Sequence, residues 1–232
     1  LPTEPGAAAS SPLLAANEVT PSTRFAVLRL PPGPPSAEEA TPDESFRCIT
    51  PPRGKKLDLS VFKPVKRDSS SFTIGYLGSL GTWYLIKEML VFFKKIKEII
   101  PNSKFHFLTK DNPEIILSQC KNLGIELKNI LIEESDIWNI PFKTRNWNLS
   151  LCFIMPSYSK IFSSPTKQGE LMAMGIPIIC NSGVGDVDYI VQKYNSGFIL
   201  NDFNKINFDK ILNTNFKKQK LKEGANQYFS LE

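Results

Sequence analysis

Apolar residues from position 72 onward switch repeatedly between strand-like runs and helical spacing. Residues 72–77 form a strand-like run, and apolar positions between Ile86 and Ile100 then repeat along one helical face, with charged residues on the other faces. The same alternation continues along the rest of the chain. It predicts further strands at 104–108, 130–132, 149–154, 176–180 and 197–200, and further helices at 112–122, 136–139, 165–174 and 186–193.

Short strands that alternate with helices close as a parallel sheet with helices on both faces and right-handed crossovers. The pattern therefore predicts one Rossmann-like α/β domain over residues 55–232. Ligands of such sheets bind beyond the carboxyl ends of the strands. The loops expected at that edge are 78–82, 156–166 and 181–186, which are rich in glycine and small hydroxyl residues.

Residues 1–54 differ from the rest of the chain in composition. Proline and alanine are the commonest residues, as in the run Leu-Pro-Pro-Gly-Pro-Pro at 30–35, and the basic residues are all arginine, while isoleucine and lysine first appear at Ile49 and Lys55. Such a segment offers little periodic apolar surface to offset its chain entropy. We expect residues 1–54 to be disordered and unrelated to the domain that follows, and they lack the pattern of a signal peptide.

Overall composition narrows the classes of function. No apolar run approaches the roughly 18 residues that would span a bilayer, so we expect a cytoplasmic protein, at most peripheral at the inner membrane face. The net charge of +5 comes from scattered lysines without an aromatic-basic motif, which gives no support to nucleic-acid binding. Four cysteines without CxxC spacing and a single histidine, His106, favour a reducing compartment and predict no metal site.

The helix expected after the fourth strand has an open N-terminus. Ser164 is a good N-cap and Pro165 suits the first helical position. Free N–H groups at Thr166 and Lys167, the helix dipole and the lysine ammonium would favour an anion there, and a diphosphate is the natural candidate. Glu170 lies about one turn further in, where a carboxylate can accept hydrogen bonds from ribose hydroxyls. The alternative is an ordinary surface helix with a solvated charge.

The loop at 78–82 follows a strand and opens a helix, as a phosphate-binding loop does. The loop does not have the sequence GxGxxG, and the second strand does not end in an acidic residue that could bind a ribose. A dinucleotide site is therefore not expected. Backbone N–H groups at Gly78, Ser79 and Gly81 are candidates for contact with a phosphate or sugar. A tight turn explains the same residues without a ligand.

Two acidic groups and a glycine loop complete the candidates. Gly183 and Gly185 lie in a loop at the ligand edge and precede Asp186-Val187-Asp188, formally a metal-binding DxD, in which helix capping by Asp186 is the simpler explanation. Glu133, Glu134 and Asp136 cluster after the third strand, where a solvated loop accounts for them and a minor role stays open. We find no Ser/His/Asp or Cys/His set and no P-loop, and His106 lies within a strand as a structural residue.

Three ordered motifs resemble the C-terminal domain of GT-B glycosyltransferases of the retaining, group 1 (GT4-like) type. They are the strand and turn at 74–84, the segment 156–170 that ends at Glu170, and the loop at 181–186. Residues 57–64 also resemble the inter-domain segment Val-Asp-x-x-x-Phe-x-Pro that precedes this domain. The resemblance covers 57–232 and implies a nucleotide-sugar donor site, with Glu170 on the ribose and the helix start at 164–167 on the diphosphate.

The resemblance also implies a reaction and its partners. It implies transfer of a sugar, with retention and without cofactor or metal, from a UDP- or GDP-linked donor to a glycan or lipid-linked acceptor. Phe162 stands where family members usually carry a second glutamate, and loop 78–83 lacks the Arg and Lys of many members, which leaves Lys167 as the main charge on the phosphates. Residues 1–54 cannot supply the N-terminal acceptor-binding domain, so we expect a fragment that is inactive alone.

Two alternatives from other classes remain open. A non-catalytic or degraded nucleotide-binding module fits the expected truncation. A GT-B-shaped sugar-nucleotide epimerase would share the domain, although it should show more acids and a histidine around the cleft than this sequence provides.

Overall fold

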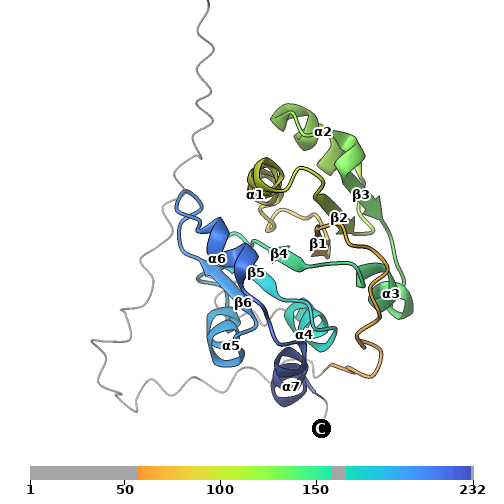
Figure 1. Cartoon of the computed structure of the whole chain (residues 1–232), viewed down its shortest axis with the longest axis vertical. Helices are drawn as coiled ribbons and strands as arrows, with labels where there is room; N and C mark the ends of the chain where they lie inside the picture. The colour runs from red at the N-terminus through yellow and green to blue at the C-terminus, as the bar shows by residue number, and fades with distance from the viewer. Residues whose placement is uncertain (1–56, 158–165, 231–232) are drawn as a thin grey trace, which may run out of the picture.

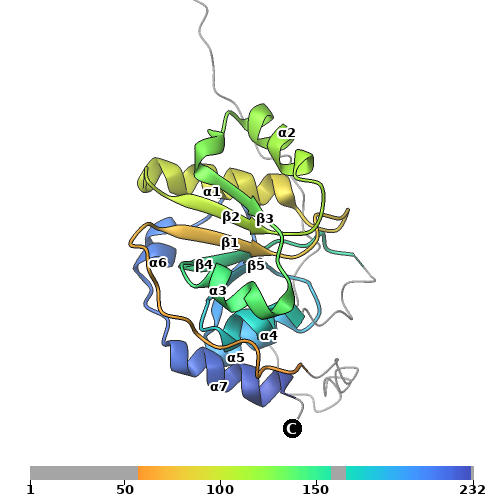
Figure 2. The same cartoon turned by 90° about the vertical axis from the view of Figure 1, so that its right-hand side faces the viewer.

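A computed structural model describes residues 57–157 and 166–230 of the 232-residue chain. The expected disorder of residues 1–54 and the expected cap at Ser164 and Pro165 lie outside the described residues. Within the described ranges the chain forms one sheet with helices against both of its faces (Figures 1 and 2).

The sheet has six strands, in the order β3-β2-β1-β4-β5-β6, and every neighbouring pair is parallel. The order reverses between β1 and β4, which is the arrangement of a doubly wound Rossmann sheet. This confirms the predicted fold class. The strands are β1 (Thr73–Leu77), β2 (Lys104–Leu108), β3 (Ile130–Glu133), β4 (Leu149–Cys152), β5 (Ile178–Asn181) and β6 (Gly197–Leu200).

The helices divide between the two faces of the sheet (Figure 2). On one face, α1 (Ile86–Ile99), α2 (Glu114–Leu123) and α6 (Phe208–Asn213) pack in a phenylalanine-rich core. On the other face lie α3 (Ile140–Thr144), α4 (Thr166–Ala173), α5 (Val187–Tyr194) and α7 (Lys218–Phe229). Because both faces of the sheet are covered, the strands read as nearly continuous apolar runs. Two short 3-10 helices, η2 (Leu127–Asn129) and η3 (Ile137–Asn139), flank β3.

The turn from α4 into β5 shows how local sequence sets an element boundary. Gly175 has φ +73°, its N–H donates to Met172 O at 2.9 Å, and the next N–H, of Ile176, donates to Leu171 O at 2.9 Å. These two bonds close the helix as a left-handed cap, as the sequence predicts. Strand β5 therefore begins at Ile178, two residues after the start of the strand expected at 176–180.

Three helices differ from the sequence expectation. Helix α3 continues directly from η3 where only a short helix at 136–139 is expected, and α6 is not expected at all. Helix α7 begins at Lys218, after the last strand that the sequence predicts. All three have a short or weak apolar pattern and depend on packing against the rest of the domain.

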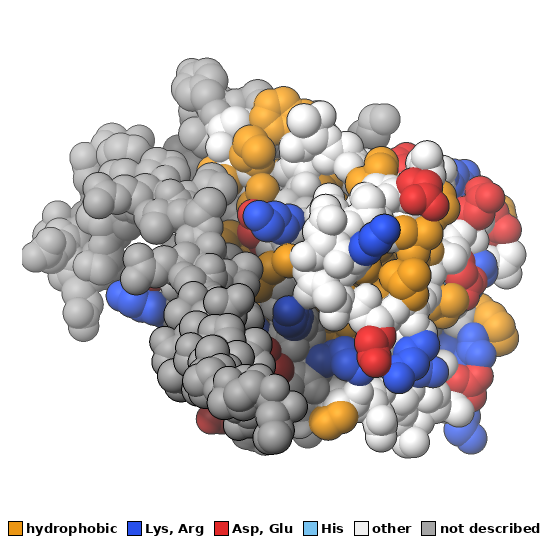
Figure 3. Space-filling model, turned by 90° about the horizontal axis from the view of Figure 1, so that it is seen from above, with side chains coloured by type: hydrophobic (Ala, Val, Ile, Leu, Met, Phe, Trp, Pro, Cys, Tyr) orange, Lys and Arg blue, Asp and Glu red, His pale blue; other side chains and the backbone are white. Residues whose placement is uncertain are grey.

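The surface is mixed in charge on the face seen in Figure 3, where Lys and Arg side chains lie among acidic and uncharged ones rather than in one continuous patch. None of the helices in 57–157 and 166–230 is long and apolar enough to pass through a bilayer.

Candidate functional site

Helix α4 follows β4, so its first turn stands at the carboxyl edge of the sheet. It is a buried helix, because every residue from Gln168 to Ala173 is buried between the sheet and α7. Gly169 permits this packing: a Cβ there would lie 2.6 Å from the Phe229 ring of α7 and 2.9 Å from the Leu57 side chain. The absence of a side chain thus allows α7 to lie directly on the first turn of α4 and hold it in place.

Lys167 and Glu170 form an ion pair one turn apart on this helix. The Lys167 Nζ lies 3.1 Å and 3.3 Å from the two carboxylate oxygens of Glu170. The lysine side chain is 40% exposed and the glutamate side chain 7%. Burial raises the pKa of Glu170, and the Lys167 ammonium partly opposes that rise. Among the described residues Lys167 is the cation that pairs with this carboxylate, which retains lone pairs that ligand hydroxyls can use.

The loop after β1 is tied down by its neighbours. The Gly78 N–H donates to Leu108 O at 3.1 Å, the Leu80 N–H donates to the Asp111 carboxylate, and the Tyr76 hydroxyl donates to Ser79 O. Gly78 N–H is therefore already used within the protein, whereas Ser79 and Gly81 are exposed at the loop tip. Asp111, a residue outside the candidates noted in the sequence, fixes the shape of this loop.

The loop after β5 uses its acidic residues within the protein. Gly183 and Gly185 have φ values of +85° and +51°. Asp188 accepts from the Ser182 hydroxyl at 2.7 Å and from the Gly183 N–H at 3.4 Å. Asp186 precedes α5, but its side chain makes no capping bond and instead accepts from the Tyr228 hydroxyl at 2.6 Å. Capping by the Asp186 side chain is therefore wrong, because the carboxylate binds α7 instead.

Asn181 joins the ends of β4 and β5. Its Oδ1 accepts from Ile154 N–H at 2.8 Å, and its Nδ2 donates to Ile154 O at 2.9 Å. This buried amide holds the chain where it leaves β4 for the loop that leads to α4. This role of Asn181 depends on the pairing of β4 with β5, which are far apart in the sequence. The sequence therefore offered no signal for it.

Gln168 is fully buried in the first turn of α4, and among residues 57–157 and 166–230 neither polar atom of its side-chain amide has a hydrogen-bond partner. It lines a small cavity of about 10 Å³ together with Cys152 and Cys180, which are register partners on β4 and β5. Burial raises the pKa of the Cys152 thiol to about 12. Burial also raises the pKa of the Cys180 thiol, so both thiols are neutral small side chains. No group of three His, Cys, Asp or Glu residues suited to a metal ion occurs in the described ranges.

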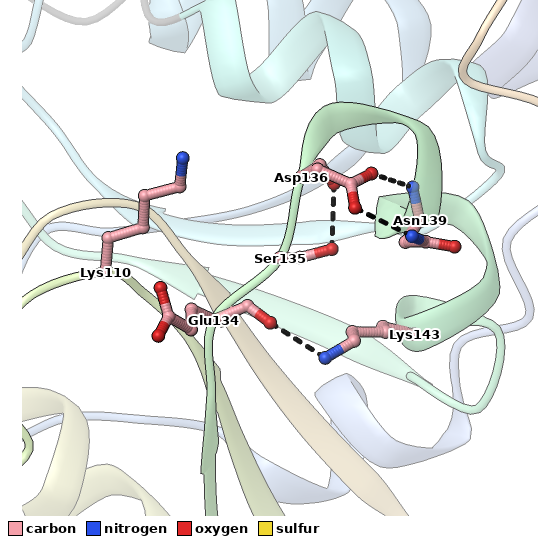
Figure 4. Close-up of a pocket in the computed structure, with 6 residues that line it drawn as sticks. All are labelled: Lys110, Glu134, Ser135, Asp136, Asn139 and Lys143. Carbon is pink, nitrogen blue, oxygen red and sulfur yellow. Dashed lines mark hydrogen bonds between the residues drawn. The ribbon is translucent and has the colours of Figure 1, made fainter.

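A larger cavity of about 320 Å³ opens beyond the ends of β2 and β3 (Figure 4). It contains two members of the acidic cluster noted in the sequence. The lining residues are Lys110, Glu134, Ser135, Asp136, Asn139 and Lys143.

His106 lies away from these loops, inside β2, and is buried. Its Nδ1 accepts from Trp147 Nε1–H at 3.0 Å, and its Nε2 lies 3.8 Å from Glu133. Burial is the main reason that its pKa falls to about 4. The imidazole is thus neutral and structural, in agreement with the sequence interpretation.

No protein-family model matches the chain, and no curated protein matches its sequence. Solved structures do match the chain in fold. The C-terminal domain of a glycosyl transferase group 1 family protein (LpcC) from Francisella tularensis aligns with a TM-score of 0.59 at 14% identity over 76% of this chain and 100% of that one. The fold is that of a GT-B C-terminal domain. At this level of identity the likeness concerns the fold.

Two longer solved structures share this fold with the chain over part of their length. Sucrose-phosphate synthase from Thermosynechococcus elongatus gives a TM-score of 0.59 at 15% identity, over 75% of this chain and 47% of that one. Anabaena HepE, in complex with UDP and glucose, gives a TM-score of 0.52 at 16% identity, over 75% of this chain and 51% of that one. This chain therefore spans about half the length of these proteins.

Proposed function

We propose that this chain is the donor-binding half of a retaining glycosyltransferase, which binds a nucleotide-sugar at the amino end of α4. The observation that carries the proposal is the Lys167–Glu170 pair at the carboxyl edge of a GT-B C-terminal fold. Ligands of parallel α/β sheets bind at this edge. The HepE structure, which has this fold, contains UDP and glucose.

In the proposed complex, the diphosphate lies at the first turn of α4, where the helix dipole and the Lys167 ammonium favour negative charge. Ribose hydroxyls donate to the buried carboxylate of Glu170, which holds lone pairs beyond those that face Lys167. Ser164 and Pro165 would cap this helix start. The exposed tip of loop 78–82, with Ser79 and Gly81, and the loop with Gly183 and Gly185 would border the donor, while the N–H of Gly78 stays with Leu108.

The catalytic contribution of this half is electrostatic. The departing diphosphate gains negative charge as the glycosidic bond to the donor breaks, and a fixed helix end with a lysine stabilises that charge in the transition state. The proposal requires no metal. We propose further that a second domain binds the glycan or lipid-linked acceptor, in keeping with full-length relatives of about twice this span. The chain alone is then expected to bind donor and to transfer no sugar.

Calorimetric titration of the chain with GDP, UDP and ADP tests the proposal, with Glu170→Ala and Lys167→Ala as variants. The matched control is the ion pair of Lys95 and Glu98 on α1, which has the same spacing and an N–O distance of 3.0 Å but is solvent-exposed. We expect each α4 variant to weaken diphosphate binding about tenfold or more, and Lys95→Ala and Glu98→Ala to leave it unchanged. Equal affinities for wild type and Glu170→Ala would refute the assignment.

A further inference from the structure

The cavity at the ends of β2 and β3 has no role in the function proposed so far. Figure 4 shows its polar side chains, which come from the loops after these strands, from η3 and from the last turn of α3. Its volume of about 320 Å³ accommodates a ring system. Every residue that lines it carries a polar side chain, so a ligand there is recognised by hydrogen bonds and charge.

Two of the four charged side chains in this cavity are already engaged. Asp136 accepts from the backbone N–H and side-chain amide of Asn139, at 3.0 and 2.8 Å. Lys143 Nζ lies 2.6 Å from a Glu133 carboxylate oxygen and donates to Glu134 O at 2.8 Å. These bonds fix the cavity wall and the backbone around it.

The other two charged side chains are available to a ligand. Within 57–157 and 166–230, the ammonium of Lys110 and the side-chain carboxylate of Glu134 have no hydrogen-bond or ion-pair partner, and they do not pair with each other. The cavity therefore presents one unpaired donor group and one unpaired acceptor group. A complementary ligand carries acceptors and N–H donors on adjoining edges.

The cavity lies along the edge on which the donor would lie. Strand β2 is two places from β4 in the sheet, which corresponds to about 10 Å at the usual strand spacing. Helices α3 and α4 lie on the same face of the sheet, where Thr144 Oγ1 of α3 lies 3.3 Å from the Sδ of Met174, the residue that follows α4. A nucleotide held by its diphosphate and ribose at α4 can thus extend its base toward the ends of β1 and β2.

We propose that the cavity after β2 and β3 receives the base of the donor and selects guanine, so that the substrate is a guanosine-diphosphate-linked sugar. Guanine offers the acceptors O6 and N7 to the Lys110 ammonium, and its 2-amino group, with the neighbouring ring N–H, offers donors to the Glu134 carboxylate. Uracil offers one ring N–H flanked by two carbonyl oxygens, which a carboxylate repels. This inference rests on the proposed donor site at α4.

The test is calorimetric titration of the full chain with GDP, IDP and UDP, where IDP lacks only the 2-amino group of guanine. We expect GDP to bind about tenfold or more tightly than UDP. Glu134→Gln should weaken GDP binding about tenfold, so that the affinity for GDP comes close to the affinity for IDP. The affinity for UDP should stay unchanged. Lys110→Ala should weaken GDP and IDP alike, because both carry O6 and N7. Both residues are exposed, so neither variant endangers folding, and Glu98→Gln and Lys95→Ala on α1 are the controls.

The guanine inference would be overturned if UDP binds as tightly as GDP or more tightly. It would also be overturned if Glu134→Gln leaves the ratio of the affinities for GDP and IDP unchanged. If UDP binds in a manner that depends on Glu170 and GDP shows no advantage, the donor site stands and only the base assignment falls. If none of the three diphosphates binds, the donor site and the base assignment fall together.

Discussion

The buried His106 is expected to make the stability of this fold fall as the pH drops below neutrality. The imidazole accepts a hydrogen bond from Trp147 through Nδ1 at 3.0 Å, which requires the neutral ring with its proton on Nε2. Trp147 can cover the strand here because Gly75, the register partner of His106, has no side chain: a Cβ would lie 1.9 Å from the indole. Protonation of Nδ1 would replace this acceptor with a second donor.

The magnitude follows from the pKa of His106. Burial lowers it from 6.5 to about 4 in the folded protein, and each pH unit of difference corresponds to about 1.4 kcal/mol. The neutral imidazole therefore contributes about 3 kcal/mol that is fully present above pH 6.5 and is lost as the pH falls toward 4. Because the folded pKa is depressed, the unfolded chain binds more protons in this window, and stability decreases with acid.

Urea denaturation between pH 7 and pH 4.5 measures this loss, with His106→Asn as the matched variant. The asparagine keeps a hydrogen-bond acceptor near the position of Nδ1 and does not titrate. The stability difference between wild type and variant should shrink by about 1.4 kcal/mol per pH unit below pH 6.5, while contributions from carboxylates largely cancel. A difference that stays constant across this range would refute the reasoning.

Three further predictions concern α4. Lys167→Ala should weaken GDP binding about tenfold and leave guanosine binding unchanged, because only the diphosphate meets the ammonium; calorimetry with both ligands checks this. Burial raises the pKa of Glu170, so its ionised form destabilises the fold, and Glu170→Gln should raise Tm at pH 7 while it weakens nucleotide binding. Gly169→Ala should destabilise the protein by about 1–3 kcal/mol in urea titrations, because the contact of its Cβ with Phe229 at 2.6 Å outweighs the better helix propensity of alanine.

The structure confirms the fold class predicted from the sequence because that prediction used local signals. Alternation of apolar periods gave six short strands, and short strands separated by helices close as a parallel sheet. The cap at Gly175 was also readable, because its positive φ is one that glycine adopts without strain. The spacing of Lys167 and Glu170 on a helix likewise placed them on one side, where the structure pairs them.

Only the tertiary structure decided which polar groups remain available to a ligand. Asp111 takes a loop N–H, Asp186 binds the distant Tyr228, and Asn181 links two strands, all through contacts between segments that the sequence separates by many residues. The cavity between Lys110 and Lys143 likewise exists because β2 and β3 end side by side. Local propensity acts over a few residues, whereas such partnerships depend on the packing of whole elements, and no periodicity in the sequence encodes them.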